Sequence, residues 1–469
     1  MAEIALVWLR NDLRLADNPA LTAALHTGLP VEALHVDETD PGLRPLGGAS
    51  RWWLHQSLAR LARDLAAIGV PLRTARGPAA GTLLDVARET RAAALFWNRR
   101  YAPAQCTIDA AIKSALRENG LRVESFAANV LIEPWDIETG TGRPYSVYTP
   151  FWKALRARAI PRPLSAPAGR SPVAVSEPVD AAYRQPRWAE KLAPHWQVGE
   201  AAAAARLAAF LEAALADYQE GRDFPARDVT SRLSPHLAFG EISPRQVWHA
   251  TEAAGQRHPA AAAATEKFLK ELVWRDFNYH QLYHRPDIAS HAMQDKFDRL
   301  AWRSDPAALA AWQRGETGFP IIDAGMRELW QTGYMQNRVR MLVGSLLAKN
   351  LLLDWRLGEA WFWDTLCDAD IASNAGNWQW VAGSGLDAAP FFRIFNPVTQ
   401  SEKFDAAGAY IRRWLPELAR LPDALIHDPT AAPAYALRDA GVSLDTTYPR
   451  AILDLKATRA RALQAFSAL

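Results

Sequence analysis

Cysteine is almost absent from this sequence of 469 residues, which contains only Cys106 and Cys367. Two cysteines so far apart suggest no disulfide framework, and the N-terminal MAEIALVWLRND turns polar too soon for a signal peptide. A membrane span needs about eighteen apolar residues, but the longest candidate, MLVGSLLAKNLLLDW, is interrupted by Lys349 and Asp354. We therefore expect a reduced, cytoplasmic protein without a membrane partner.

An excess of charge of one sign is also lacking. The formal net charge is +2, so bulk electrostatics do not indicate a nucleic-acid partner, and any such partner must meet a local basic patch. The contents of hydrophobic residues, 49%, and charged residues, 22%, are those of an ordinary globular chain. The length favours more than one domain.

Several patterns that carry known chemistry are missing. No GxGxxG follows the first apolar run, so the standard dinucleotide fingerprint is absent. His280 and His284 are four residues apart, but no Glu completes an HExxH motif, so we interpret them as structural and expect no metal site. Neither cysteine has a base nearby in the sequence and no Ser/His/Asp arrangement stands out, which argues against hydrolysis by a protein nucleophile.

Tryptophan, by contrast, is abundant, with 19 copies. The densest group runs from Trp302 to Trp380 and ends in the segment DADIASNAGNWQW, which combines two acids, an amide and two indoles. Core packing is the commonest use of a single tryptophan. The crowding of indoles beside acids nevertheless fits a bound redox cofactor better than a hydrolytic site.

The chain shows three regions of different character. Residues 1–130 alternate short apolar runs (IALVWL, VEALHV, ALFWN, LRVESF) with segments of helical period, which predicts an α/β domain with a doubly wound parallel sheet. Residues 131–199 include a proline-rich stretch and are predicted to be an interdomain linker. Residues 200–469 contain helical patterns joined by glycine and proline, and predict a large all-α domain.

Two helical segments place polar residues on one face. In KELVWRDF, Glu271, Trp274 and Arg275 have the spacing i, i+3, i+4. A surface ion pair beside a core tryptophan would have the same pattern. In YMQNRVRM, Asn337, Arg340 and Met341 share a face, and the alternative there is a solvated stripe.

A hydroxyl-rich loop precedes one of the predicted helices. The segment RDVTSRLSPHLAFGEISP offers Thr230, Ser231 and Ser234 together with backbone amides, an arrangement that suits an anion such as pyrophosphate. A simple helix N-cap is the alternative interpretation.

Read together, seven segments resemble the DNA photolyase/cryptochrome family: TSRLSP, ELVWRDF, FPIIDAGMREL, YMQNRVRM, DWRLGEAWF, DADIASNAGNWQW and RIFNPVTQSEKFD. The resemblance covers essentially the whole chain and is strongest from Tyr218 to Asp405. Within the family the sequence is most similar to photolyases that repair cyclobutane pyrimidine dimers. The α/β domain would then be the antenna-type domain, and residues 200–469 would bind FAD and DNA.

The resemblance implies roles for specific residues. FAD, active as FADH⁻, would be held by Tyr218, Thr230, Ser231, Arg232, Leu233, Ser234, Glu271, Arg275, Asn337, Arg340, Asp368, Asp370 and Asn374. Asn374 would face flavin N5, where plant cryptochromes typically carry Asp. Electrons would reach the flavin through Trp302, Trp355 and Trp378.

Damaged DNA is the partner that the resemblance implies, for a protein that acts as a monomer. Trp274 and Trp380 would line the lesion pocket, with Glu271 and Asn337 stabilising charge on the pyrimidine carbonyls, so that Glu271, Asn337 and Asn374 are the predicted catalytic residues. Further DNA contacts are expected from Arg338, Met341, Arg393 and Lys403. Excited FADH⁻ would donate an electron to the dimer and receive it back after ring opening, with the dimer extruded from the stack as in other base-flipping enzymes.

Three departures from the family pattern stand out. Gln336 replaces a histidine found in many relatives, which counts against the six-four class because that class is thought to need a proton donor. Asn377 replaces a glycine, without a physical explanation from the sequence. Ala104 and Gln105 stand where folate-binding members have Asn and Glu, so the alternatives for the antenna chromophore are methenyltetrahydrofolate held differently, deazaflavin, another flavin or none.

Two other functions compete with repair. A blue-light receptor of the cryptochrome type would use the same FAD site without repair activity. Such receptors often add a long C-terminal tail, whereas this sequence ends at Leu469, soon after the family core. A flavin-dependent electron carrier is disfavoured by the pair Trp274 and Trp380.

Overall fold

The computed structural model describes residues 3–175 and 179–469. The chain divides into two compact units, Met1–Ala216 with Ser231–Pro286 and Asp217–Thr230 with Asp287–Leu469. The first unit therefore includes helices from the region after residue 200, and the predicted boundaries at 130 and 199 remain a prediction.

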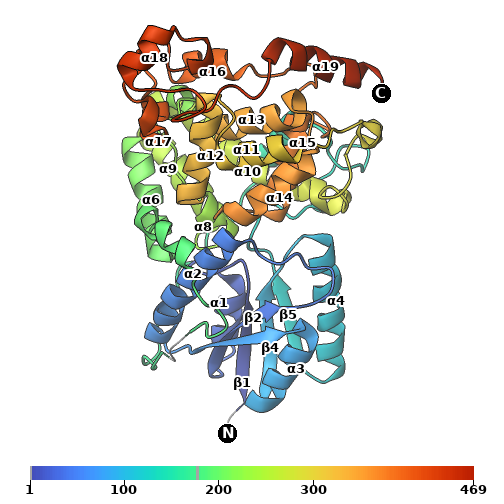
Figure 1. The fold of residues 1–469 in the computed structure, drawn as a ribbon. Helices are drawn as coiled ribbons and strands as arrows, with labels where there is room; N and C mark the ends of the chain where they lie inside the picture. The colour runs from blue at the N-terminus through green and yellow to red at the C-terminus, as the bar shows by residue number, and fades with distance from the viewer. Residues whose placement is uncertain (1–2, 176–178) are drawn as a thin grey trace. The chain divides into compact units, whose positions relative to one another are not determined.

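A five-stranded parallel sheet forms the centre of the first unit (Figure 1). Its strands are β1 (Ile4–Leu9), β2 (Val31–Glu38), β3 (Leu72–Gly77), β4 (Ala92–Asn98) and β5 (Arg122–Phe126), in the order β3-β2-β1-β4-β5. The helices α1 (Pro19–His26) and α2 (Gly48–Ala67) lie on one side, and α3 (Ala79–Thr90) and α4 (Pro103–Glu118) on the other. This arrangement confirms the predicted doubly wound fold.

The burial of each strand explains whether the strand can be recognised in the sequence as an apolar run. In β1 every residue after Ile4 is buried, because helices cover both faces of a parallel sheet. The edge strand β3, by contrast, has the sequence LRTARG with no fully buried residue, so it lacks an apolar run. This is why the periodicity predicts four strands and misses β3.

The remaining helices of the first unit are α5 (Tyr148–Arg156), α6 (Glu200–Ala213), α8 (Ser234–Ala238), α9 (Pro244–Arg257) and α10 (Ala262–His284). The capping box of α9, in which Ser243 and Gln246 exchange hydrogen bonds, is a local N-terminal signal of the kind that sequence reasoning can detect. The helix α10 carries Glu271, Trp274 and Arg275.

The second unit is helical in its described residues, apart from isolated bridges. Its α-helices are α7 (Tyr218–Gly221), α11 (Pro306–Arg314), α12 (Pro320–Thr332), α13 (Asn337–Ser345), α14 (Trp355–Thr365), α15 (Ile371–Ala382), α16 (Pro397–Phe404), α17 (Ala409–Trp414), α18 (Ala434–Ala440) and α19 (Leu455–Ser467). A π-helical turn, Leu346–Asn350, follows α13. These observations confirm the predicted large helical part.

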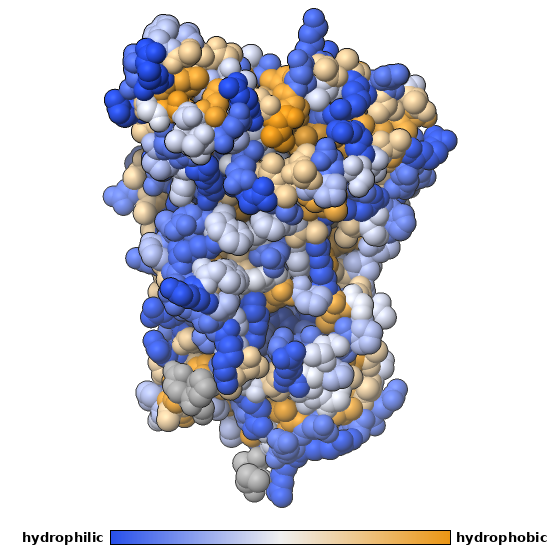
Figure 2. Space-filling view, in the orientation of Figure 1, coloured by the Kyte–Doolittle hydropathy of each residue, from blue (hydrophilic) through white to orange (hydrophobic). Residues whose placement is uncertain are grey.

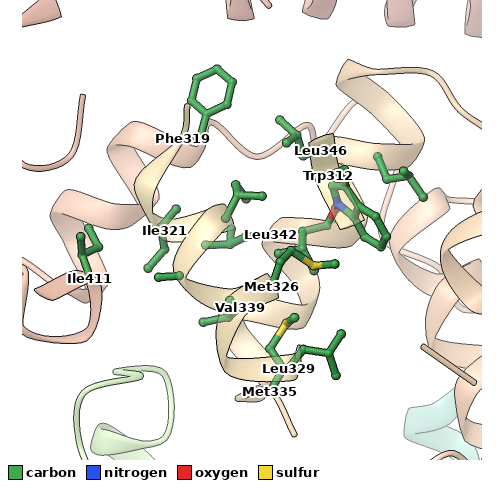
Figure 3. Close-up of a cluster of buried hydrophobic side chains, with 14 of the residues drawn as sticks. Trp312, Phe319, Ile321, Met326, Leu329, Met335, Val339, Leu342, Leu346 and Ile411 are labelled. Carbon is green, nitrogen blue, oxygen red and sulfur yellow. The ribbon is translucent and has the colours of Figure 1, made fainter. Parts of the chain in front are cut away.

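One hydrophobic cluster organises the second unit. Figure 3 shows Val339 and Leu342 of α13 beside Met326 of α12. The helices approach closely at Gly325, where an added Cβ would lie 2.3 Å from a methyl of Val339. Such contact requires a residue without a side chain.

The surface is mostly polar on the face shown in Figure 2, where apolar residues form small patches. In the part of the chain that the structure describes, we find no helix that combines the length and the apolar character of a membrane span.

Candidate functional site

The helix α15 begins directly after Asp370 and contains Asn374, Trp378 and Trp380, which are all predicted site residues. Asp370 is its N-cap, and the carboxylate accepts hydrogen bonds from the backbone N–H groups of Ala372, at 3.2 Å, and Ser373, at 2.7 Å. This is ordinary capping chemistry, so Asp370 has a structural task whether or not it also meets a ligand.

Asn374 lies on the same helix and is buried. Its amide nitrogen donates to the backbone carbonyl of Glu359, at 3.0 Å, and to the carboxylate of that residue, at 2.7 Å. Glu359 is itself buried on α14. Because both bonds use the nitrogen, the side-chain oxygen of Asn374 is the atom that remains to accept a hydrogen bond from a ligand.

Arg340 and Asp368 form a bidentate ion pair, with nitrogen to oxygen distances of 3.2 and 2.8 Å. The guanidinium also donates to the carbonyl of Met335 at 2.7 Å. Burial lowers the pKa of Arg340, but the neighbouring Asp368 carboxylate outweighs it, so the pKa of Arg340 is raised. The predicted pair therefore exists, and its extra hydrogen bond supplies the satisfaction that a buried pair needs.

The three predicted electron-transfer tryptophans belong to one apolar environment. Trp355 and Trp378 are members of the main hydrophobic cluster, and Trp302 packs against it. Trp302 is the most exposed of the three, whereas the other two are at most 3% exposed. Of the three, only Trp302, the solvent end of the predicted path, is partly exposed.

Trp378 is held from two sides. Its ring meets Phe362 edge-on, with centroids 5.1 Å apart, and Trp312, at 6.2 Å. A Cβ on Gly358 of α14 would lie 2.1 Å from the Trp378 ring. Gly358 therefore makes room for this indole. Trp380, two residues later, is partly buried against the same cluster.

The start of α13 is built around Gln336. Its side-chain oxygen accepts hydrogen bonds from the N–H groups of Arg338, at 2.6 Å, and Val339, at 3.3 Å, and its nitrogen donates to the carbonyl of Arg222. Gln336 is thus a buried N-cap. An amide suits this position because it both donates and accepts without titrating.

The residues after Gln336 differ in their surroundings. Asn337 is exposed and lies near the sulfur of Met341, at 3.8 Å. Arg338 is mostly covered: it pairs with Asp223 at 2.7 Å and lies 4.4 Å above the ring of Phe404. A phosphate contact by Arg338, which remains a prediction, would compete with Asp223.

Two other predicted DNA residues are exposed. Arg393 lies on a turn between α15 and α16, and Lys403 lies on α16 with its ammonium 5.1 Å from the ring of Phe404. Neither has an ion pair among the described residues, which leaves both charges available to a phosphate.

The hydroxyl-rich loop is divided between the units, with Tyr218 and Thr230 in the second and Ser231 to Ser234 in the first. Tyr218 is buried and its hydroxyl accepts from Arg222 at 3.3 Å. Arg232 has a positive φ of 49°, which is uncommon for a residue with a side chain. Ser231 accepts a hydrogen bond from the N–H of Leu233 at 3.4 Å, and Ser234 begins α8.

The helix α10 holds Trp274 in a fixed orientation. The ring of Tyr148 stacks on it with centroids 3.9 Å apart and planes 7° from parallel, and Phe277 meets it edge-on at 5.6 Å. The Tyr148 hydroxyl donates to the carbonyl of Lys270 at 2.5 Å, one turn before Trp274. One face of the indole is therefore covered. Glu271, on the same helix, pairs with Lys267 at 2.9 Å.

The residues of α10 that follow Trp274 also bind their own unit. Arg275 donates to the carbonyl of Asn129, and Asp276 accepts from the N–H of Leu131 at 2.5 Å. Burial raises the pKa of Asp276 to about 6. His280 accepts from the N–H of Tyr145 at 2.9 Å, so its contacts are structural, as predicted. Arg275 has a structural partner that the sequence does not reveal.

The carboxyl ends of the sheet strands hold a buried ionic network. Arg10 lies 3.1 Å from Asp109, and Arg100 lies 2.6 Å from both Asp109 and Glu38. The Arg10 guanidinium also covers the Trp8 ring at 3.9 Å. Ligands of parallel α/β sheets usually bind at this edge. Here the chain's own side chains occupy much of it, and Ala104 and Gln105 lie nearby at the start of α4.

Sequence reasoning missed three residues: Tyr148, Glu359 and Gln379. Gln379 is fully buried, and its amide bonds the backbone of Ile288, His291 and Met293 at 2.7 to 2.8 Å. No sequence spacing connects any of these residues with its partner. The position of Gln379 between two tryptophans was the one available signal in the sequence.

The comparisons with known proteins agree with this architecture. Residues 5–168 match the family described as DNA photolyase, and residues 268–468 match the FAD binding domain of DNA photolyase. A deoxyribodipyrimidine photo-lyase of Agrobacterium fabrum is 50% identical and covers 99% of this chain and 98% of its own length. Cryptochrome-1 of Arabidopsis thaliana is 38% identical over 99% of this chain and 70% of its own length.

A solved structure is also closely similar. A bacterial class III photolyase from Agrobacterium tumefaciens superimposes with a TM-score of 0.95 and 49% identity, covering 100% of this chain and 98% of that one. The chain belongs to the DNA photolyase family. The predicted family, the two-part fold and the assignment to an enzyme family are thereby confirmed.

Proposed function

We propose that this protein repairs cyclobutane pyrimidine dimers in DNA, using light and a bound reduced FAD. Whole-chain similarity to proteins named deoxyribodipyrimidine photo-lyase supports the reaction class. The observation that carries the proposal is the fixed indole of Trp274, which has one face stacked on Tyr148 and is only partly buried. A rigid aromatic wall suits an extruded dimer, because stacking replaces the contacts that the dimer loses in the duplex.

The residues of the second unit fit the flavin. The Asn374 oxygen can accept a hydrogen bond from a protonated ring nitrogen, since Glu359 holds the amide nitrogen in place. Arg340 and Asp368 can bind the polar edge of the ring without leaving an unpaired charge. Reduced FAD, when bound, would supply the electron that opens the cyclobutane ring and would recover it afterwards.

Other predicted residues would contact the DNA substrate or the phosphates and ribitol of FAD. Glu271, Trp380, Asn337 and Met341 would meet the dimer, while Arg393 and Lys403 would meet phosphates. Tyr218, Thr230 and the segment Ser231 to Ser234 would hold the phosphates and ribitol of FAD, with Arg232 adding positive charge nearby. Arg275 would be among the residues that line the adenine and isoalloxazine. Trp302, Trp355 and Trp378 would carry electrons that reload the cofactor.

The cyclobutane dimer is proposed in preference to the six-four lesion. Reversal of the six-four lesion needs a group that moves a proton. Gln336 does not titrate, and its side chain is already used in capping α13 and in binding the Arg222 carbonyl. The position therefore offers no proton donor.

Repair can be tested with purified protein, a chemical reductant and an oligonucleotide that carries one cyclobutane dimer. We expect illumination to restore the two pyrimidines, and a dark sample to leave the dimer intact. A matched oligonucleotide with a six-four lesion should remain unchanged. If light restores no pyrimidines although FAD is bound and reduced, the receptor interpretation, which the similarity to cryptochromes supports, takes the place of repair.

A further inference from the structure

Lys349 is a fully buried lysine that the proposed reaction does not use. It lies in the π-helical turn Leu346–Asn350, with no exposed surface. Among the described residues no carboxylate pairs with its ammonium group. π-Helical turns inside helices are frequent at functional sites, and a buried ammonium group requires hydrogen-bond partners.

The partners of Lys349 are two backbone carbonyls of one turn. Its nitrogen donates to the carbonyl of Arg393 at 3.0 Å and, in a longer contact of 3.5 Å, to that of Pro390. The N–H of Arg393 also bonds the Pro390 carbonyl at 2.9 Å, which closes the turn. Lys349 therefore ties together the two ends of the segment Pro390–Arg393.

This turn separates buried from exposed side chains. Phe391 is buried, stacks on Phe466 with centroids 4.8 Å apart, and lies 5.5 Å from the Lys349 nitrogen. The next residue, Phe392, is 63% exposed, and Arg393 is exposed beside it. The turn thus presents a bare aromatic ring next to an unpaired cation.

We propose that Lys349 is a positioning residue that holds the turn Pro390–Arg393 in the conformation in which Arg393 meets a DNA phosphate. The inference rests on the proposed function, because it assumes that this face binds DNA. A lysine suits the task because its ammonium group has three N–H donors and its flexible side chain can reach both carbonyls. A turn that is ordered in advance binds more tightly, since less conformational freedom is lost on binding.

Charge adds a measurable signature. Burial, and to a smaller extent the charge of Arg393, lowers the pKa of Lys349 to about 7. Arg461 of α19 donates a hydrogen bond to the Asn350 carbonyl at the end of the π-helical turn Leu346–Asn350. An arriving phosphate favours the protonated amine, so DNA binding near pH 7 should be accompanied by proton uptake.

The test compares Lys349→Met, Arg393→Ala and the double variant, using a duplex with one cyclobutane dimer. We expect Lys349→Met to weaken binding about fivefold, within the usual range for lost hydrogen bonds, with FAD content and light-driven FAD reduction unchanged. The double variant should bind no more weakly than Arg393→Ala alone. Calorimetry in buffers of different ionisation enthalpy should show proton uptake in the wild type and none in Lys349→Met.

Several outcomes would overturn the inference. They are wild-type affinity in a folded Lys349→Met variant, additive losses in the double variant, or full affinity in Arg393→Ala. If Lys349→Met does not fold, Arg393→Ala still decides, because full affinity in that variant contradicts the proposal. Failure of the proposed function is seen separately, as absence of dimer repair by the wild type under light.

Discussion

The helices α10 and α15 carry many of the predicted site residues, but they divide their tasks differently. On α10 the structural contacts of Arg275, Asp276 and His280 follow Trp274 in the sequence and bind the segment 129–145. On α15, residues with structural contacts alternate with predicted site residues. Gln379, whose side chain bonds the backbone of Ile288 and His291, stands between Trp378 and Trp380. The comparison teaches that the partner of a polar or aromatic side chain, and not its residue type, decides its role.

The largest effect is expected when the cofactor-side indole of α15 is changed. Trp378→Phe should abolish light-driven reduction of oxidised FAD, while repair by chemically reduced protein continues. Absorbance under illumination with an external reductant measures this. Trp312→Phe is the matched control, because that ring lies 6.2 Å from Trp378 but outside the predicted path. Equal photoreduction in wild type and Trp378→Phe would remove Trp378 from the path.

The structural residue of α15 should affect stability instead. Gln379→Ala leaves buried backbone groups of Ile288, His291 and Met293 without partners, which should lower the free energy of unfolding by roughly 4 kcal/mol. Denaturant unfolding measures the change. Asn377→Ala is the control on the same helix: among the described residues this exposed side chain bonds only the Ser373 carbonyl, and its loss should change stability by about 0.5 kcal/mol or less. Equal midpoints for the two variants would contradict this division.

On α10, Asp276 predicts a pH dependence of stability. Burial raises its pKa in the folded protein to about 6, above the ordinary value of 3.8. The folded state therefore binds more protons between these values, and this group's contribution to stability is lost as pH rises from about 4 to 6. The loss should approach about 3 kcal/mol. The variant Asp276→Asn keeps an oxygen that can accept the hydrogen bond from the Leu131 N–H, and its free energy of unfolding should lack this pH dependence. An identical pH profile in both proteins would contradict the role of Asp276.

The smallest effect concerns the support of Trp274. Tyr148→Leu removes the stacked ring and should weaken binding to dimer-containing DNA about fivefold, because an aromatic pair contributes about 1 kcal/mol. Tyr148→Phe keeps the ring and loses only the hydrogen bond to Lys270, so its loss should be smaller. Affinities for damaged and undamaged duplexes separate lesion recognition from general DNA binding. If Phe and Leu weaken binding equally, stacking is not the cause.

Local patterns predicted much of the fold. The apolar runs of β1, β2, β4 and β5 are visible in the sequence because helices cover both faces of the sheet, and the long amphipathic helices are visible because burial of one face imposes a period. The segment QNRVRMLVGSLLAKNLLLDW has a helical pattern, like much of residues 200–469, but the structure has α13, a π-helical turn and a break before α14. Leu352, with a φ of 56°, lies in that break. The leucines of this break, at positions 351 to 353, are buried in the core. Their packing stabilises an irregular backbone that helix propensity does not predict.

The sequence by itself determined the family, the two-part fold and the residue types at each predicted position, because motif spacing and hydrophobic period are local properties. Only the tertiary structure decided which atoms those residues use: the Asn374 nitrogen bound to Glu359, Gln336 acting as a cap, Arg338 paired with Asp223 and Lys349 fixed on a distant turn. Apart from the N–H groups that Gln336 caps, each of these partners is at least 15 residues away in the chain. Hydrogen bonds and ion pairs depend on distances of a few ångströms, which chain spacing alone does not fix.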